Sequence, residues 1–171
     1  MTGGARAGKS DFALKLAQGM SLPVEPGSTP VLFVATAEAL DAEMTDRIKR
    51  HQADRGEGWR TIEAPLDLVS VIQGEINPGE SVLIDCLTLW LSNLFHHNRD
   101  IEQETMALCT ALQSSQVQIA LVSNEIGLGL VPETSLGRAF RDAQGRLNQN
   151  VAAVCDQVDF VAAGLPLRLK G

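Results

Sequence analysis

Residues 3–10 read GGARAGKS and are the first in the chain whose types and spacing could do chemistry. They match the pattern G-x-x-x-x-G-K-S, in which glycines let several backbone N–H groups converge on phosphate oxygens. Phe12 and Leu16 continue with the apolar spacing of a helix, whose positive end would face the same phosphates. We predict that Lys9 bridges the outer phosphates of a nucleotide and that the Ser10 hydroxyl binds Mg²⁺.

An acidic residue, Asp85, ends the apolar run VLID, where a buried strand would end. Proteins with this loop place an acid there, and we predict that Asp85 holds Mg²⁺ directly or through water. The alternative is a chance match in a Gly-rich turn, which would not require the helix, the second strand and the acid to follow in order. Only Met1 and Thr2 precede the loop, so we expect a truncated first strand and a natural protein that continues upstream.

The stretch 38–65 combines an apolar helical stripe with a basic end around one histidine. Leu40, Met44 and Ile48 recur at helical spacing, and the same stripe continues to His51. The nearby positive charges are Arg47, Lys49, Arg50, Arg55 and Arg60. In a chain of net charge -7 they predict an anionic ligand, for which His51 could be a general base, a hydrogen-bond donor or a nucleophile. A solvated basic helix end, with His51 beside the core, would give the same pattern.

The segment 121–149 starts as a strand, passes through a loop and becomes a helix from about Leu136. Its polar residues are Ser123, Asn124, Glu125, Arg138, Arg141, Asp142, Asn148 and Gln149. Loops at the carboxyl ends of parallel strands are where α/β proteins bind ligands, so this segment is a candidate for ligand contact. The alternative is a charged, solvated helix with Asn124 and Glu125 as its caps.

Apolar runs without polar alternation are typical of strands that are covered on both faces. They occupy residues 31–36, 81–87, 119–124 and 159–165. Helical spacing lies between them, with stripes at Ile101, Met106, Cys109 and Leu112, and at Leu136, Phe140, Ala143, Leu147 and Val151. This alternation predicts an α/β fold with a mostly parallel, P-loop NTPase-like sheet flanked by helices, in one domain over residues 1–171.

Composition excludes several classes of protein. A chain of 171 residues with 44% hydrophobic residues can bury a sizeable core, and its net charge of -7 argues against nucleic acid or an anionic membrane as partner. The cysteines Cys86, Cys109 and Cys155 are scattered, as reduced cytosolic thiols are. No apolar run approaches the roughly 20 residues that span a bilayer. We therefore expect a soluble, cytoplasmic protein.

Five segments together resemble the bifunctional adenosylcobinamide kinase / adenosylcobinamide-phosphate guanylyltransferase family, in register over nearly the whole chain. They are GGARAGKS, ATAEALDAEMTDRIKRHQADRGEGWRTIEAPLDL, LIDCLTLWLSNL, SNEIGLGLVPETSLGRAFRDAQGRLNQ and AGLPLRLK. Many families share the phosphate loop, so the second and fourth segments make the resemblance specific. It implies that ATP or GTP phosphorylates adenosylcobinamide, and that GTP then gives GMP to the new phosphate with loss of pyrophosphate.

The resemblance also implies roles for individual residues. His51, in RIKRHQADR, would be the catalytic histidine that carries GMP between the two substrates, and Ser10 and Asp85 would hold Mg²⁺. Nucleotide contacts carry over to Gly3, Gly4, Ala5, Arg6, Ala7, Gly8, Lys9, Ser10, Ala35, Thr36, Ala37, Gln52, Ala53, Asp54, Arg55, Glu63 and Asp85. The family's assembly implies a homotrimer with sites between subunits. Ala7 stands where the family often has Ser, and we expect little effect because the loop binds through its backbone.

Two other functions fit part of the pattern. A plain small-molecule kinase would use His51 only as a phosphate contact and would form no covalent GMP. A nucleotide-binding protein without turnover would result if the truncated strand disabled the loop, and about six upstream residues would then restore it. The segment SNEIGLGLVPE favours the two-step enzyme, because neither alternative requires it.

Overall fold

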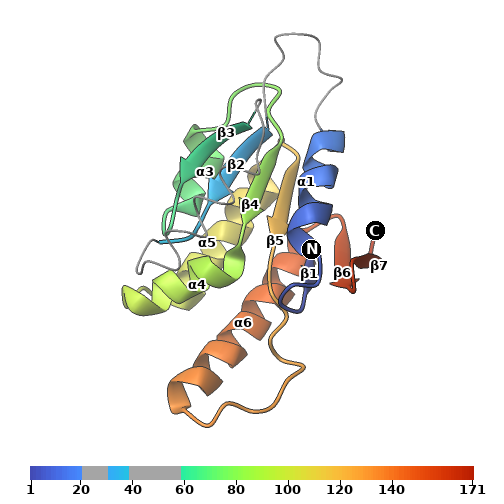
Figure 1. Cartoon of the computed structure of the whole chain (residues 1–171). Coiled ribbons are helices and arrows are strands. Elements are labelled where there is room, and N and C mark those ends of the chain that lie inside the picture. Colours follow the sequence, from blue (N-terminus) through green and yellow to red (C-terminus); the bar gives the residue numbers. More distant parts are fainter. Residues whose placement is uncertain (21–30, 39–58) are drawn as a thin grey trace.

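The computed structural model describes residues 1–20, 31–38 and 59–171. Its strands are β1 (Thr2–Gly3), β2 (Val31–Ala35), β3 (Trp59–Glu63), β4 (Val82–Asp85), β5 (Ile119–Val122), β6 (Val158–Ala162) and β7 (Leu165–Lys170). Its helices are α1 (Lys9–Met20), α3 (Leu68–Gly74), α4 (Leu87–His96), α5 (Ile101–Ser114) and α6 (Ser135–Val154) (Figure 1). The alternation of strands and helices confirms the predicted α/β fold.

The strands pair in parallel, apart from a C-terminal hairpin. One ladder has the order β3-β2-β4-β5 and the other the order β1-β6-β7, in which β6 and β7 are antiparallel. Backbone bonds join the ladders: the Met1 amino group donates to the Leu121 carbonyl at 2.7 Å, and the Ser123 N–H donates to the Met1 carbonyl at 3.0 Å. Because β1 therefore lies between β5 and β6, the phosphate loop leaves the sheet at an interior strand (Figure 1).

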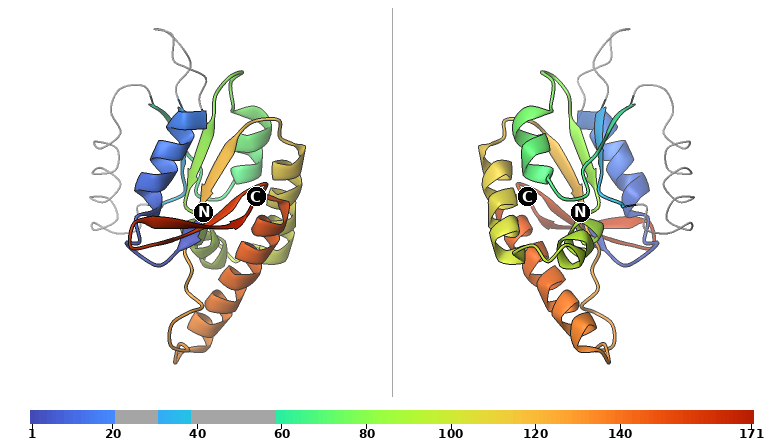
Figure 2. Two further views of the ribbon diagram at one scale, coloured as in Figure 1. Left: turned by 90° about the vertical axis from the view of Figure 1, so that its right-hand side faces the viewer. Right: turned by 90° about the vertical axis from the view of Figure 1, so that its left-hand side faces the viewer.

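Helices cover both faces of the sheet, as the apolar runs predict (Figure 2). Side chains alternate along β2: Val31 and Phe33 pack with Ala13 and Ala17 of α1, whereas Leu32 and Val34 join the larger core beneath α3, α4, α5 and α6. The larger core is centred on buried side chains of α4, including Trp90. Strands buried on both faces need this layered arrangement, which is why their sequence is continuously apolar.

Two strands were not predicted, and one predicted strand ends early. β3 carries Arg60 and Glu63 and lies at the sheet edge, so it has no continuous apolar run. The predicted strand 159–165 ends at Ala162, and the chain turns at Ala163 and Gly164, which have φ of 52° and 78°. Two successive positive φ values match the right-handed twist of a hairpin, so β7 follows directly as an exposed antiparallel strand.

The predicted helical stripes are correct in part. Met106 and Leu136, which the spacing placed on the buried faces of their helices, are 63% and 66% exposed. The buried face of α5 instead carries Thr105, Leu108 and Ala111. The cap of α6 is Thr134, whose hydroxyl accepts from the Gly137 N–H at 3.1 Å, rather than Asn124 and Glu125. Leu136 lies in the first turn of α6, beyond the reach of the main core.

The first strand is short, as predicted, and a cavity of about 470 Å³ adjoins Met1. Residues 115–121 line one side of the cavity, and residues 154–157 with Asp159 line another. Burial of the Met1 ammonium group lowers its pKa below the usual 8.0. Among the described helices, none has the length and apolar character needed to cross a membrane.

Candidate active site

The phosphate loop is held in a conformation that side chains would obstruct. Gly3 has φ of 153°, and a Cβ atom there would lie 2.2 Å from the Val161 carbonyl oxygen of β6. Gly8 has φ of 95°, and its carbonyl accepts the Phe12 N–H at 3.1 Å in the first turn of α1. A tight glycine-containing turn that runs into a helix amino terminus is the backbone arrangement that binds phosphate in other proteins.

Lys9 is buried within this loop, 7% exposed, and its Nζ donates to the Gly4 carbonyl at 2.6 Å. Burial lowers the pKa of Lys9, while the nearby Cys86 and Asp85 oppose that effect. An ammonium group in such surroundings gains more from an added anion than a solvated one, because little water screens the attraction. Lys9 is thus placed to neutralise phosphate charge.

Ser10 and Asp85 meet across the first turn of α1 and the end of β4. The Ser10 hydroxyl donates to Asp85 Oδ2 at 3.0 Å. A hydroxyl and a carboxylate are hard oxygen ligands of the kind that Mg²⁺ takes together with substrate phosphates and water. Among the described residues no group of three or more His, Cys, Asp or Glu side chains could hold a metal ion.

The carboxyl ends of four strands form one row beside this pair. Glu63 of β3 pairs with Ala35 of β2, Ala35 pairs with Asp85 of β4, and Asp85 pairs with Val122 of β5. Parallel strands end at the same edge of a sheet, so residues predicted from distant segments come together there. Glu63 is exposed at this edge, and Ala37 is partly exposed two residues beyond Ala35.

Thr36, which the resemblance assigns to the nucleotide, is fully buried. Its hydroxyl donates to the Cys86 carbonyl and accepts the Cys86 N–H, each at 2.8 Å. The hydroxyl thus acts as both donor and acceptor, and it holds the backbone of Cys86, the residue after Asp85. Burial raises the pKa of the Cys86 thiol to about 11, which keeps this cysteine protonated near neutral pH.

Two contacts that support the site were not predicted from the sequence. Asn93 of α4 is buried and donates to the carbonyls of Thr36 at 2.7 Å and Pro65 at 2.9 Å, tying together the ends of β2 and β3. The Gly164 N–H in the C-terminal hairpin donates to the Ala7 carbonyl of the phosphate loop at 2.8 Å. Asn93 lies three residues after Trp90 on the same helix face, so the sequence could have predicted that it faces the core. No residue near Gly164 in the sequence indicates its contact with the phosphate loop.

Part of the predicted site lies outside the described residues. These residues are His51, Gln52, Ala53, Asp54 and Arg55, together with Arg47, Lys49 and Arg50 of the basic cluster. Arg60, also assigned to that cluster, lies on β3 and forms an ion pair with Glu80 at 2.6 Å, with a further bond to the Glu75 carbonyl. The Arg60 charge is therefore neutralised by the buried Glu80 carboxylate, so Arg60 is not placed to bind an external anion.

The polar residues predicted in 121–149 divide into two groups. Ser123, Asn124 and Asn148 come together at the end of β5, and Gln144, which the sequence reasoning missed, joins them. Arg138 donates to the carbonyls of Pro132 and Glu133, so it braces the loop before α6. Asp142 and Gln149 are exposed.

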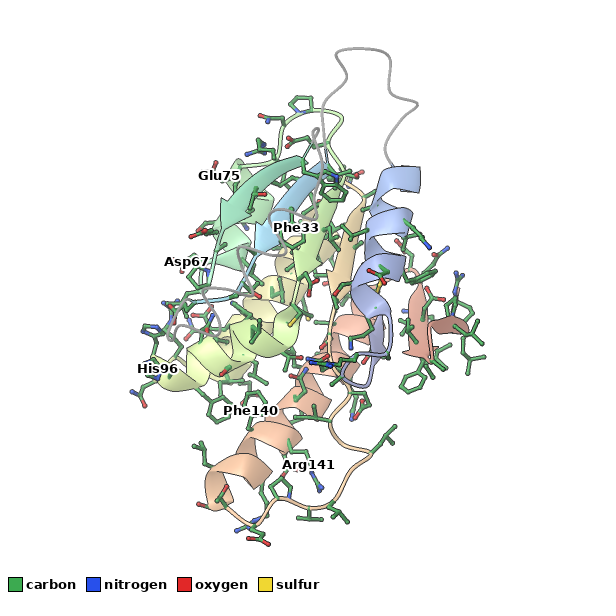
Figure 3. The ribbon with its side chains drawn as sticks, viewed as in Figure 1. Phe33, Asp67, Glu75, His96, Phe140 and Arg141 are labelled. Atoms are coloured by element: carbon green, nitrogen blue, oxygen red, sulfur yellow. The ribbon has the colours of Figure 1, made fainter. Side chains whose placement is uncertain are left out.

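An aromatic contact joins α6 to α4. Figure 3 shows Arg141 and Phe140 on α6. The Phe140 ring packs edge-on against Phe95 of α4, with 5.4 Å between the ring centroids.

Two further histidines, His96 and His97, lie at the carboxyl end of α4. His97 follows the last helical residue and contacts the Glu38 carboxylate at 3.1 Å, an ion pair when the imidazole is protonated. His96 is the last residue of α4, at the opposite end of the helix from Leu87, which follows the carboxyl end of β4 (Figure 3). The two histidine rings pack edge-on against each other, 5.3 Å between centroids.

The chain matches the family described as "Cobinamide kinase / cobinamide phosphate guanyltransferase" over residues 1–169. It is 44% identical to "Bifunctional adenosylcobalamin biosynthesis protein CobP" of Pseudomonas aeruginosa, over 99% of this chain and 95% of that protein. It is 38% identical to "Bifunctional adenosylcobalamin biosynthesis protein CobU" of Escherichia coli and 36% to the protein of the same name from Salmonella typhimurium, in each case over 99% of this chain and 98% of the relative. Because the family model matches nearly the whole chain and these relatives are 36–44% identical to it over 99% of its length, the chain belongs to the cobinamide kinase / cobinamide phosphate guanyltransferase family.

Proposed function

We propose that this enzyme carries out two consecutive reactions on adenosylcobinamide. In the first, ATP or GTP phosphorylates the aminopropanol hydroxyl. In the second, GMP passes from GTP to that phosphate through a covalent guanylyl-His51 intermediate, forming adenosyl-GDP-cobinamide. The family match over residues 1–169 is the observation that carries the proposal, and the buried Lys9 within a glycine-rich loop supports it.

In the kinase step the acceptor oxygen attacks the γ-phosphorus, the bond to the β-phosphate oxygen breaks, and the hydroxyl proton passes to a base. Phosphoryl transfer relies on positioning and charge stabilisation more than on covalent chemistry by the protein. Lys9 offsets charge on the outer phosphates, and loop N–H groups hold the remaining oxygens. Glu63 and Asp85 lie at the same sheet edge, and either carboxylate is a candidate to take the proton. Ser10 and Asp85 would hold Mg²⁺, which would supply further neutralisation of phosphate charge.

In the guanylyl step a neutral imidazole nitrogen of His51 attacks the α-phosphorus of GTP. A phosphorus–nitrogen bond forms, and the bond to the β-phosphate oxygen breaks, so that pyrophosphate leaves. An oxygen of adenosylcobinamide phosphate then attacks the same phosphorus and displaces His51, which restores the free imidazole. Lys9 stabilises the pyrophosphate because its ammonium group is already buried beside the loop.

We further propose that Gln52, Ala53, Asp54 and Arg55 contact the nucleotide beside His51, together with the loop and the ends of β2 and β3. The working unit is a homotrimer with sites between subunits, and the enzyme acts in the cytoplasm as one domain. Analytical ultracentrifugation tests the trimer directly, since a monomeric mass at assay concentration would contradict it.

Intact mass spectrometry after incubation with GTP and Mg²⁺ tests the central step. We expect a GMP-sized adduct on the parent chain and none on His51→Ala. The adduct should be lost in acid and remain in base, as a phosphorus–nitrogen bond to histidine requires. His96→Ala is the matched control, because His96 lies at the exposed end of α4 and should retain the adduct.

Two outcomes would contradict the proposal. An adduct that persists on His51→Ala would place the covalent group on another residue. A parent chain that binds GTP and phosphorylates cobinamide without forming an adduct would leave only the plain kinase.

A further inference from the structure

A polar cluster is buried where α6 crosses the end of β5. Gln144 is fully buried, and its Nε2 donates to Ser123 Oγ at 3.0 Å and to Asn148 Oδ1 at 2.9 Å. The Ser123 hydroxyl also donates to Asn148 Oδ1 at 2.6 Å. Ser123, directly after β5, and two polar side chains of α6 therefore form one connected network.

The network is linked to the backbone at the carboxyl end of β5. Asn148 Nδ2 donates to the Asn124 carbonyl at 3.0 Å, and the Asn124 N–H donates to Thr88 Oγ1 at 2.9 Å. The peptide units on both sides of Asn124 are thus fixed by side chains, one from α6 and one from the first turn of α4. The next residue, Glu125, donates its N–H to the Gly3 carbonyl at 2.8 Å.

This arrangement places segment 123–125 between the two halves of the candidate active site. On one side it bonds to Gly3, the first residue of the phosphate loop. On the other side it follows Val122, which pairs with Asp85. Segment 123–125, which α6 contacts through Asn148, therefore connects the phosphate loop to the strand pair that ends at Asp85.

Packing alone would not require this network. Burying polar side chains is unfavourable unless all their groups are paired, and Gln144 Oε1 has no hydrogen-bond partner among the described residues. An apolar residue at 144 would fill the same helix face, as Ala143, Leu147 and Val151 do nearby. Hydrogen bonds are directional, whereas apolar contacts are not. The bond from Asn148 therefore fixes the orientation of the backbone after β5.

We propose that Gln144 and Asn148 are positioning residues for phosphoryl and guanylyl transfer. They act through segment 123–125, which sets the phosphate loop against Asp85, and they do not touch the nucleotide. Small displacements of reacting groups lower turnover strongly, because the bound geometry must lie close to that of reaction.

Asn148→Asp tests the link most sharply. The carboxylate still accepts from Ser123 and Gln144, but it cannot donate to the Asn124 carbonyl and sets a charged oxygen against it. Asn150→Asp is the matched control, since Asn150 is exposed on the same helix and the chemical change is identical. Gln144→Leu removes the centre of the network, and Gln113→Leu makes the same change at an exposed position on α5.

The measurement is the steady-state phosphorylation of cobinamide, below the melting temperature of every variant and corrected for folded protein. This readout does not depend on His51. We expect Asn148→Asp and Gln144→Leu to lower kcat by about tenfold or more, while KM for the nucleotide changes by less than about threefold. Both exposed controls should stay within about twofold of the parent.

A kcat within about twofold of the parent in folded Asn148→Asp and Gln144→Leu, even with a lowered melting temperature, would overturn the proposal and leave a structural role only. A loss confined to KM would overturn it equally. If Gln144→Leu does not fold, Ser123→Ala removes a single hydroxyl from the network, and a reduced kcat in that variant is the expected result.

Discussion

The two ends of the parallel sheet use polar residues in different ways. At the amino ends of β3 and β4, Arg60 and Glu80 form an ion pair at 2.6 Å, and the Asn77 N–H also donates to the Glu80 carboxylate at 2.8 Å. At the carboxyl ends, polar side chains such as Thr36 and Asn93 bind backbone groups and hold loops in place. At the amino ends the charged side chains pair with each other. At the carboxyl ends the polar side chains instead hold the backbone of the loops that form the candidate site.

Charge follows the same division. The Glu80 side chain is fully buried, and its bond from Arg60 lowers the pKa of the carboxyl, so this pair is matched within the fold. Lys9 is buried with its ammonium on a backbone carbonyl, and desolvation lowers its pKa. A cation that bears a desolvation penalty is suited to an incoming anion, while a paired one is not. Changes at the carboxyl end should therefore affect activity, and changes at the amino end should affect stability.

The largest effect is expected at Lys9. Lys9→Met keeps much of the side-chain volume but removes the charge, so kcat/KM for nucleotide-dependent transfer should fall by about 100-fold or more, roughly 3 kcal/mol. Urea unfolding should show little loss of stability, because the variant no longer buries an ammonium group. Lys15→Met is the control on the exposed face of α1. Equal activity of the two variants would remove Lys9 from the working site.

Asp85→Asn should have the next largest effect. The amide removes the carboxylate charge beside Ser10, and we expect kcat to fall by about 10- to 100-fold, with more Mg²⁺ needed for half-maximal rate. A titration of rate against Mg²⁺ measures both changes. Asp142→Asn, at an exposed position on α6, should match the parent. An unchanged Mg²⁺ dependence in Asp85→Asn would show that this carboxylate does not hold the ion.

At the opposite end, Glu80→Gln should reduce stability and leave turnover intact. Arg60 loses its buried partner, so the free energy of unfolding should fall by about 2 kcal/mol, while kcat per folded molecule stays the same. Chemical denaturation measures the free energy of unfolding, and kinetics on the same preparation measure kcat. Glu75→Gln serves as the control, since that side chain is exposed. A fall in kcat without a fall in stability would break the comparison between the two ends.

The same pair predicts a pH dependence with a definite sign. Because the folded pKa of Glu80 is lowered by the bond from Arg60, its contribution to stability is present above the unfolded value near 4.5 and is lost as the pH falls through the lowered pKa. The parent should therefore lose more stability on acidification than Glu80→Gln does. Parallel loss in the two proteins would remove the ion pair as the cause.

The sequence by itself determined the layered α/β fold and the positions of the phosphate loop and Asp85. These features depend on local signals: β2, β4 and β5 are continuously apolar because both faces are covered, and the loop needs glycines wherever it occurs. Ser123 and Asn148 were also visible as polar residues out of place, and Gln144 could have been found four residues before Asn148 on the same helix face.

Only the tertiary structure decided which residues support the loop. Gly164 and Ala7 bond to each other although most of the chain separates them, and Asn93 joins the ends of two strands from a helix that follows both. Their roles depend on strand order, which brings β6 beside β1 and places α4 below β2 and β3. The tertiary structure also determined that β3 and β7 are strands. Each pairs with a neighbour on one side only and is partly or wholly exposed, so neither has the continuous apolar run that marks a buried strand in the sequence.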